Sequence, residues 1–128
     1  MPPVARLFIV LGSVNAALAV IFGAFGAHAL KARLSPEMLS VYHTGAQYHF
    51  YHALGMLLIG VLATQLQNSG ALRLPGFLML AGIVLFSGSL YLLAITGVTW
   101  LGAITPLGGI AFIAAWVLLA ISALRATS

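Results

Sequence analysis

Long apolar stretches separated by short polar segments make up most of this chain. Charged residues occur at Arg6, within residues 31–37, at Arg73 and at Arg125, and the stretches between them carry none. A helix needs about 20 apolar residues, each rising about 1.5 Å, to cross roughly 30 Å of hydrocarbon. The first two stretches each hold one such helix and the last holds two. The pattern therefore predicts an all-α fold, a membrane bundle forming a single domain over residues 1–128, with four transmembrane helices at about 5–30, 36–66, 75–97 and 106–125.

Capping signals predict where three of these helices begin. Ser35 precedes a proline and a glutamate, which predicts an N-cap at Ser35 and a helix start at Pro36. Thr105 precedes another proline and predicts the same arrangement for the last helix. The third helix is expected to start at Pro75, in the first helical position, and to end at Gly97.

Small residues follow one narrow stripe along the first helix, and Asn15 lies on its edge. The members of the stripe are Gly12, Ala16, Ala19, Gly23, Gly26 and Ala27. In lipid, close contact between small residues drives helix association, because apolar burial gains nothing there. The stripe predicts a packing seam, with the lining of a conduction path as the alternative. A second seam, with a seven-residue repeat on the third helix, is predicted at Gly82, Ser89 and Thr96.

Composition supports a membrane protein and excludes several kinds of chemistry. The chain is 62% hydrophobic and 5% charged, whereas soluble domains average about 25% charged residues. It has no cysteine, which excludes disulfides, thiolate catalysis and cysteine-ligated metal centres. Glu37 is its one acidic residue, which excludes paired-carboxylate catalysis and a Ser-His-Asp triad. The missing membrane-embedded carboxylate also counts against a proton-coupled transporter.

The five basic residues predict an orientation rather than a nucleic-acid partner. The formal net charge is +4, but the basic residues are scattered at helix ends and form no patch. In a four-helix bundle Arg6, Arg73 and Arg125 fall on one side of the membrane, and Lys31 and Arg33 fall on the other. Because Lys and Arg are enriched in cytoplasmic segments, three against two favours cytoplasmic termini.

Most of the polar side chains lie at His28 and within residues 42–52. The second helix would be about 45 Å long, so residues 42–52 are expected at the membrane interface or half submerged. At 100° per residue, one face of this helix carries Tyr42, Gly45, His49, His52 and Met56, with Tyr48 at its border, and the opposite face carries His43, Gln47 and Tyr51. His49 and His52 are one turn apart and could share a ligand.

Three interpretations of these polar residues are open. The favoured one is a polar interfacial belt or a structural hydrogen-bond network, with no cofactor. The alternative is a metal or haem site made by His28 with His49 or His52, because imidazole ligates both, and a quinone or lipid headgroup is a third option. Zinc would need three imidazoles, or water, to complete four ligands. The candidates for any of these roles are His28, Gln47, Tyr48, His49, Tyr51 and His52.

Two motifs resemble a known family. They read Gly23-Ala-Phe-Gly26-Ala-His28-Ala-Leu30 and Tyr42-x-x-Gly45-x-Gln47-Tyr48-x-x-Tyr51-His52-Ala-Leu54. With the four-helix layout, they make most of the chain similar to the domain of unknown function 423 family, small bacterial inner-membrane proteins with a eukaryotic transmembrane branch. The resemblance implies no activity, substrate or cofactor. It places His28, Gln47 and His52 in characteristic motifs and His43 and His49 where members differ, which favours His28 and His52 as ligands.

The sequence therefore predicts a non-enzymatic accessory or structural role in the bacterial inner membrane. The expected partners are the lipid bilayer and either other membrane proteins or further copies of the chain, with no nucleic acid. One alternative is haem, metal or quinone binding by His28, Gln47 and His52. Another is a small oligomeric transporter or channel, against which the missing embedded charge counts.

Overall fold

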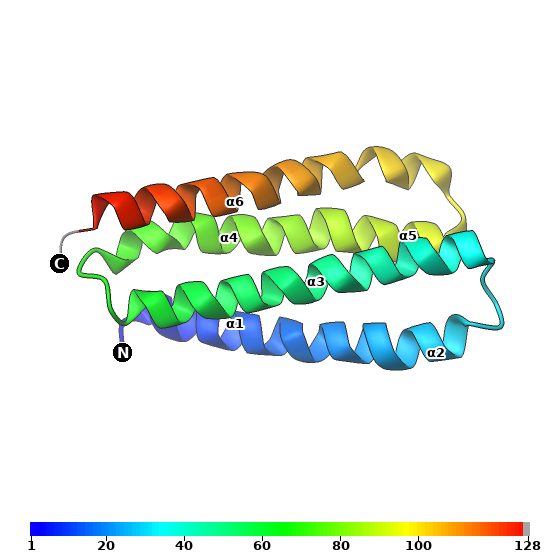
Figure 1. Cartoon of the computed structure of the whole chain (residues 1–128), viewed down its shortest axis with the longest axis horizontal. Helices are drawn as coiled ribbons and strands as arrows, with labels where there is room; N and C mark the ends of the chain where they lie inside the picture. Colours follow the sequence, from blue (N-terminus) through cyan, green and yellow to red (C-terminus); the bar gives the residue numbers. More distant parts are fainter. Residues whose placement is uncertain (127–128) are drawn as a thin grey trace.

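The computed structural model describes residues 1–126, and every regular element in that range is helical. Figure 1 shows rod-like helices lying side by side along the long axis, with both termini at the same end. The first rod contains α1 (Pro3–Val20), the π-helical turn η1 (Ile21–Gly26) and α2 (Ala27–Leu30), and the second is α3 (Pro36–Ala63). The third contains the 3₁₀ turn η2 (Ser69–Leu72), α4 (Arg73–Gly82), the π-helical turn η3 (Ile83–Ser87) and α5 (Gly88–Thr96), and the 3₁₀ turn η4 (Thr99–Ala103) leads to α6 (Thr105–Arg125).

Two of the predicted helix boundaries are confirmed. The Ser35 hydroxyl accepts a hydrogen bond from the Met38 backbone N–H at 3.1 Å, which satisfies one of the free donors at the start of α3. Gly97 ends α5 in the left-handed conformation, with φ +72°, which glycine adopts without a steric penalty. α3 itself ends at Ala63, three residues before the predicted limit at residue 66.

Two other helix starts lie within two residues of the prediction but differ from it in detail. The third rod does not start at Pro75, because η2 leads directly into α4 at Arg73 and Pro75 lies within the first turn, where a proline costs no hydrogen bond. Thr105 does not cap α6 from outside but lies within it and makes no capping bond. Its hydroxyl is instead 2.6 Å from the Ser89 hydroxyl on α5. The Thr105 hydroxyl therefore joins α5 to α6 instead of capping α6.

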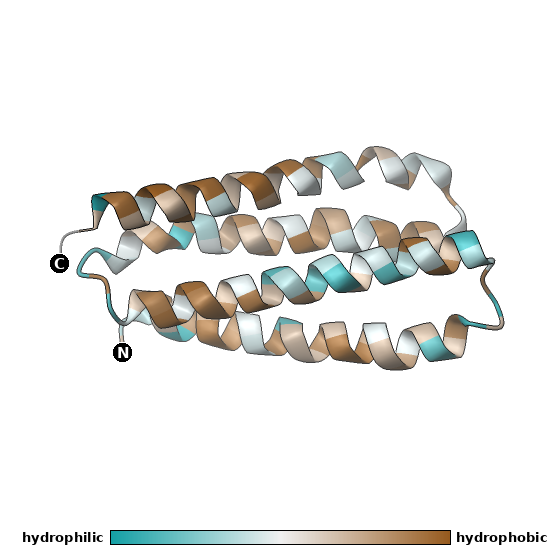
Figure 2. Ribbon diagram, in the orientation of Figure 1, coloured by the Kyte–Doolittle hydropathy of each residue, from teal (hydrophilic) through white to brown (hydrophobic). Residues whose placement is uncertain are grey.

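Three helical stretches are long and apolar enough to cross a membrane, rather than the four predicted. Within residues 1–126 they are Pro3–Leu30, Ser69–Thr96 and Thr99–Arg125. α3 is 28 residues long, but Gln47, His49 and His52 lower its average hydropathy. Figure 2 shows hydrophilic residues along the half of α3 nearer α2 and hydrophobic residues along the half that leads to α4. Length and composition alone therefore support three spans.

The backbones of α1 and α3 lie against each other. A Cβ added to Gly12 would lie 2.6 Å from the Leu57 nitrogen and 2.9 Å from the Ala53 carbonyl oxygen. A Cβ added to Gly60 would lie 2.7 Å from the Ile9 nitrogen. These contacts involve main-chain atoms, so no rotamer change could relieve them. Glycine at both positions is what permits this approach, as in other small-residue membrane seams.

Aromatic residues lying against glycines join the remaining helices. The ring of Phe8 rests on Gly76 and the ring of Phe112 on Gly82, while Gly108 of α6 lies against the backbone and Cβ of Phe86. The largest apolar core cluster, which includes Phe8, Met56, Ile59 and Met79, lies toward the end that holds the termini. Of the second predicted seam, Ser89 is buried against α6, while Thr96 is exposed and bonds the Leu92 carbonyl of its own helix. The polar residues of α3 lie between this core and the opposite end.

Candidate functional site

His49 links three helices through both of its ring nitrogens. It is buried on α3, with Nε2 3.0 Å from Asn15 Oδ1 on α1 and Nδ1 2.9 Å from the Tyr91 hydroxyl on α5. The Asn15 amide nitrogen donates to the Leu11 carbonyl at 2.9 Å, which turns the amide oxygen toward the imidazole. An amide oxygen can only accept hydrogen bonds, so the His49 Nε2–H donates to it. The Nδ1 atom then accepts a hydrogen bond from the Tyr91 hydroxyl. This bonding fixes one neutral tautomer.

His52 is held in the opposite tautomer. Its Nδ1 is 2.8 Å from the Tyr48 carbonyl oxygen, so Nδ1–H donates. The Trp116 indole N–H of α6 donates to Nε2 at 3.0 Å. The imidazole also stacks on Phe112, with ring centroids 3.5 Å apart and planes inclined by 8°. Like His49, this ring is buried and has both nitrogens occupied by protein groups.

Further hydrogen bonds connect the rods on either side of the two imidazoles. The Tyr42 hydroxyl of α3 donates to the Phe22 carbonyl in η1 at 2.7 Å and lies directly over Gly26, where any side chain would collide with it. The Ser89 and Thr105 hydroxyls join α5 to α6. The polar groups therefore form links between helices rather than the lining of one pocket.

The predicted faces of α3 are confirmed by burial. Tyr42, Gly45, His49, His52 and Met56 are buried, whereas His43, Gln47 and Tyr51 are exposed. Tyr48, predicted at the border, is 38% exposed and packs its ring against Phe86. One side of the helix therefore faces the bundle, and the other faces its surroundings.

The structure does not gather all of the predicted candidates. His28 is exposed on α2, and no hydrogen bond or ring contact joins it to His49 or His52. Gln47 lies with His43 on the wall of an open groove of about 470 Å³ between the first rod and α3. The resemblance favoured His28 over His49 as a ligand, yet His49 is the buried residue and His28 the exposed one.

The bonding of the two buried histidines bears on metal and haem binding. Within residues 1–126 no three or more His, Asp or Glu side chains lie close enough to hold a metal ion together. A metal or haem iron needs an imidazole nitrogen with a free lone pair. At His49 and His52 that lone pair already accepts a hydrogen bond, from the Tyr91 hydroxyl and from the Trp116 indole N–H respectively. Ligation would require breaking one of these bonds.

The predicted seam residues of α1 differ in how tightly they pack. Gly12 allows the close approach of α3 described above, and Asn15 bonds His49. Ala16 and Gly23 are only partly buried. A Cβ on Gly23 would lie 3.5 Å from the Ala46 Cβ, an ordinary van der Waals distance. The tight part of the seam is therefore near Gly12.

Sequence reasoning missed the residues that complete the two histidine links. Tyr91, Trp116 and Phe112 lie in apolar stretches that the hydropathy pattern predicts only as spans. A signal was available, because a Tyr hydroxyl or Trp indole within a membrane helix needs a hydrogen-bond partner. The sequence has two buried imidazoles to supply acceptors, but it does not show which helix faces which.

Comparison with known proteins assigns the chain to a family. The model described as "Protein of unknown function (DUF423)" matches residues 22–109. The chain belongs to this family. Its match includes both motifs from which the resemblance was inferred, and that inference is confirmed. The protein is thus an integral membrane protein of a family without a characterised activity.

Several bacterial proteins are similar to this chain over almost its whole length. "UPF0382 membrane protein YwdK" of Bacillus subtilis is 52% identical over 120 residues, which cover 94% of this chain and 98% of the relative. "UPF0382 membrane protein SERP0230" of Staphylococcus epidermidis is 47% identical, covering 94% and 97%. "UPF0382 membrane protein SSP2132" of Staphylococcus saprophyticus is 46% identical, covering 94% and 98%. No solved structure is significantly similar to the chain.

Proposed function

We propose that this DUF423 protein has a non-enzymatic, structural or accessory role in the bacterial inner membrane. One observation carries the proposal: all four ring nitrogens of His49 and His52 are hydrogen-bonded within the protein. An imidazole that ligates a metal or transfers a proton needs a nitrogen that faces its ligand or substrate. These two rings face other helices, so their role is to hold α3 to α1, α5 and α6.

Hydrogen bonds are well suited to this role inside a membrane. Lipid tails are as apolar as leucine, so burial of apolar surface does not pull helices together. Interhelical hydrogen bonds in membranes contribute about 0.6 kcal/mol on average and up to about 1.7 kcal/mol. The links made by His49, His52 and Ser89 each join different helices and act together with the glycine contacts. Together they set both the spacing and the register of the bundle.

α3 is proposed as the fourth transmembrane span. It lies alongside the other rods over their whole length (Figure 1), and 28 residues at about 1.5 Å each extend about 42 Å. His49 and His52 lower its mean hydropathy but point into the bundle, away from lipid. The large exposed hydrophobic residues of α3 are Tyr48, Phe50, Tyr51, Leu54, Leu58 and Val61, and the polar side chains exposed among them include His43 and Gln47. The two buried imidazoles therefore account for part of the low hydropathy of α3 without being exposed to lipid.

Four spans place both termini on the same side of the membrane. Arg6, Arg73 and Arg125 are at the end of the bundle that holds the termini, and Lys31 and Arg33 are at the other end. The excess of basic residues supports a cytoplasmic location for the termini.

Metal and haem content tests the structural role against cofactor binding. We expect protein purified in mild detergent to contain iron, zinc and copper far below one atom per chain, because neither buried imidazole has a free nitrogen. Mass spectrometry measures all three metals in one experiment. Near-stoichiometric metal that is lost in His52→Ala, and retained in the matched surface variant His43→Ala, would contradict the proposal.

A further inference from the structure

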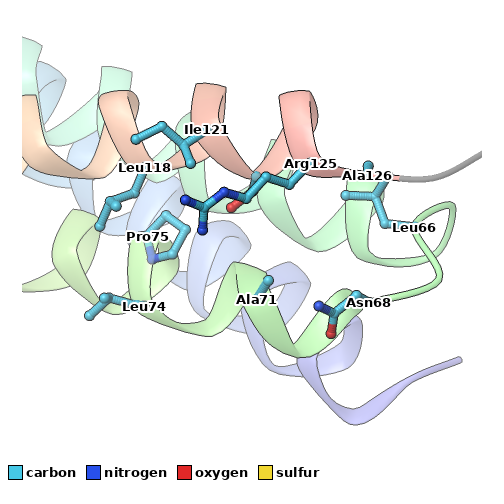
Figure 3. A pocket seen from close by; sticks show the side chains of 10 residues that line it. Leu66, Asn68, Ala71, Leu74, Pro75, Leu118, Ile121, Arg125 and Ala126 are labelled. Carbon is cyan, nitrogen blue, oxygen red and sulfur yellow. The ribbon is translucent and has the colours of Figure 1, made fainter.

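An amphipathic cavity opens between α4 and α6 at the end of the bundle that holds the termini. Its volume is about 400 Å³, within the range of roughly 300–1,000 Å³ that small-molecule sites occupy. Figure 3 shows that the Arg125 side chain reaches from α6 across this cavity toward Pro75 of α4. Apolar side chains form much of the remaining wall, namely Leu66, Leu74, Leu118 and Ile121.

Among the described residues, the only charged side chain that lines this cavity is the positive Arg125. Glu37, the one acidic side chain of the sequence, lies at the start of α3, at the opposite end of the bundle. No described residue makes an ion pair or hydrogen bond with the Arg125 guanidinium. A guanidinium presents parallel N–H donors that match two phosphate oxygens, and such charge-assisted bonds are stronger than neutral ones. The site is therefore suited to an anion with phosphate-like geometry.

The cavity has polar and apolar walls next to each other, which matches the polar headgroup and apolar chain of a lipid. Asn68 and Ser122 line the same cavity as Arg125 and offer neutral hydrogen-bonding groups. A soluble anion would leave Leu118 and Ile121 facing water, whereas an acyl chain would cover them. The cavity lies at the end of two membrane-length helices, where the headgroups of a bilayer begin.

We propose that this cavity binds one anionic phospholipid, with its phosphate at Arg125, its glycerol near Asn68 and Ser122, and an acyl chain along Leu118 and Ile121. A zwitterionic lipid carries an ammonium group that the unpaired guanidinium repels, so phosphatidylglycerol is favoured over phosphatidylcholine. On the proposed orientation the cavity opens to the cytoplasmic leaflet, whose surface is negative. The site does not depend on the paired histidines.

Native mass spectrometry of the full chain in detergent tests this site with three probes. We expect one phosphatidylglycerol per chain, retained about tenfold more strongly than phosphatidylcholine, and no binding of glycerol phosphate, the soluble headgroup. Arg125→Gln should weaken the retention of phosphatidylglycerol by about tenfold. Arg6→Gln removes one charge at the same end without touching the cavity and should leave binding unchanged.

A second variant separates loss of the site from loss of the fold. Ala71→Leu keeps every charge and fills the cavity from η2, where Ala71 is exposed, so it should displace the lipid without unfolding the protein. Equal binding of phosphatidylglycerol and phosphatidylcholine would overturn the proposal. A loss of phosphatidylglycerol retention in Arg6→Gln as large as that in Arg125→Gln would also overturn it. Binding of glycerol phosphate as tight as that of the lipid would identify a free phosphate compound as the ligand instead. Metal analysis is independent of all these results, so the structural role can fail while the lipid site stands.

Discussion

Gly12→Leu is expected to lower the free energy of unfolding by about 3 kcal/mol, the upper end of the usual cost of overpacking. A side chain at this position meets the Leu57 nitrogen and the Ala53 carbonyl oxygen, both within 3 Å of the added Cβ. Because these are main-chain atoms of α3, α1 must move away along its length. Denaturation by a titrated harsh detergent, followed by circular dichroism, measures the loss.

Gly23→Leu is the matched control on the same helix. Its Cβ has an ordinary contact with Ala46, and the rest of the side chain can extend into the open groove beside α3. We expect a change below about 1 kcal/mol, as for other positions that can adapt. Equal midpoints for Gly12→Leu and the wild type would show that α1 and α3 do not pack at the distance the structure gives.

Removing the His49 imidazole is expected to have the second largest effect. His49→Leu keeps most of the volume but leaves the Asn15 amide oxygen and the Tyr91 hydroxyl without a partner in the interior. An unpaired buried polar group costs about 1–3 kcal/mol, so we expect a loss of about 2 kcal/mol in the same unfolding assay. His28→Leu, on the exposed surface of α2, is the matched control and should change stability by less than about 0.5 kcal/mol.

The double variant Asn15→Leu/His49→Leu shows whether the two residues act as a pair. Replacing both partners of a hydrogen bond with apolar groups leaves fewer unpaired atoms than replacing one. The double variant should therefore lose less stability than the sum of the two single variants, a difference that a double-mutant cycle measures directly. Strictly additive losses would mean that the two side chains are not bonded in the folded protein.

The sequence predicts the faces of α3 well because helical periodicity is a local property. A 100° rotation per residue places His49 and His52 on one side and Gln47 and Tyr51 on the other, as the burial of these side chains confirms. The caps at Ser35 and Gly97 are local for the same reason, since each depends on the conformation of a few neighbouring residues. Both features can be read without knowing which helices are neighbours.

The hydrogen-bond partners could not be predicted, because they depend on how the helices align in depth. Tyr91 is 42 residues from His49 along the chain, and Trp116 is 64 residues from His52. Nothing in the local sequence shows that these pairs lie at the same level of the bundle. Thr105 illustrates the converse, since its local sequence predicts a cap but tertiary packing brings its hydroxyl to Ser89. The turns η1 and η3 also shift the register of two rods, and periodicity gives no sign of them.

If α3 is the fourth span, as proposed, tertiary packing explains in part why its hydropathy falls short of that of the other three. Hydropathy is averaged around a helix, so His49 and His52 count against α3 even though neither faces its surroundings. A buried imidazole with both nitrogens paired no longer needs water. The two imidazoles therefore lower the average hydropathy of α3 without facing its surroundings, whereas His43 and Gln47 lower it from the outward face.

Labelling of single cysteines in intact cells tests the four-span bundle most directly, because the chain has no cysteine of its own. Ala32→Cys lies in the connection between α2 and α3, Gln65→Cys follows α3, and Ala126→Cys follows α6. With a membrane-impermeant maleimide, a four-span bundle with cytoplasmic termini should give labelling of Ala32→Cys in intact cells and of Gln65→Cys and Ala126→Cys only after lysis. The mirror-image pattern would keep four spans and invert the orientation. Labelling of Ala32→Cys and Gln65→Cys from the same side would contradict the account, because α3 would then not cross the membrane.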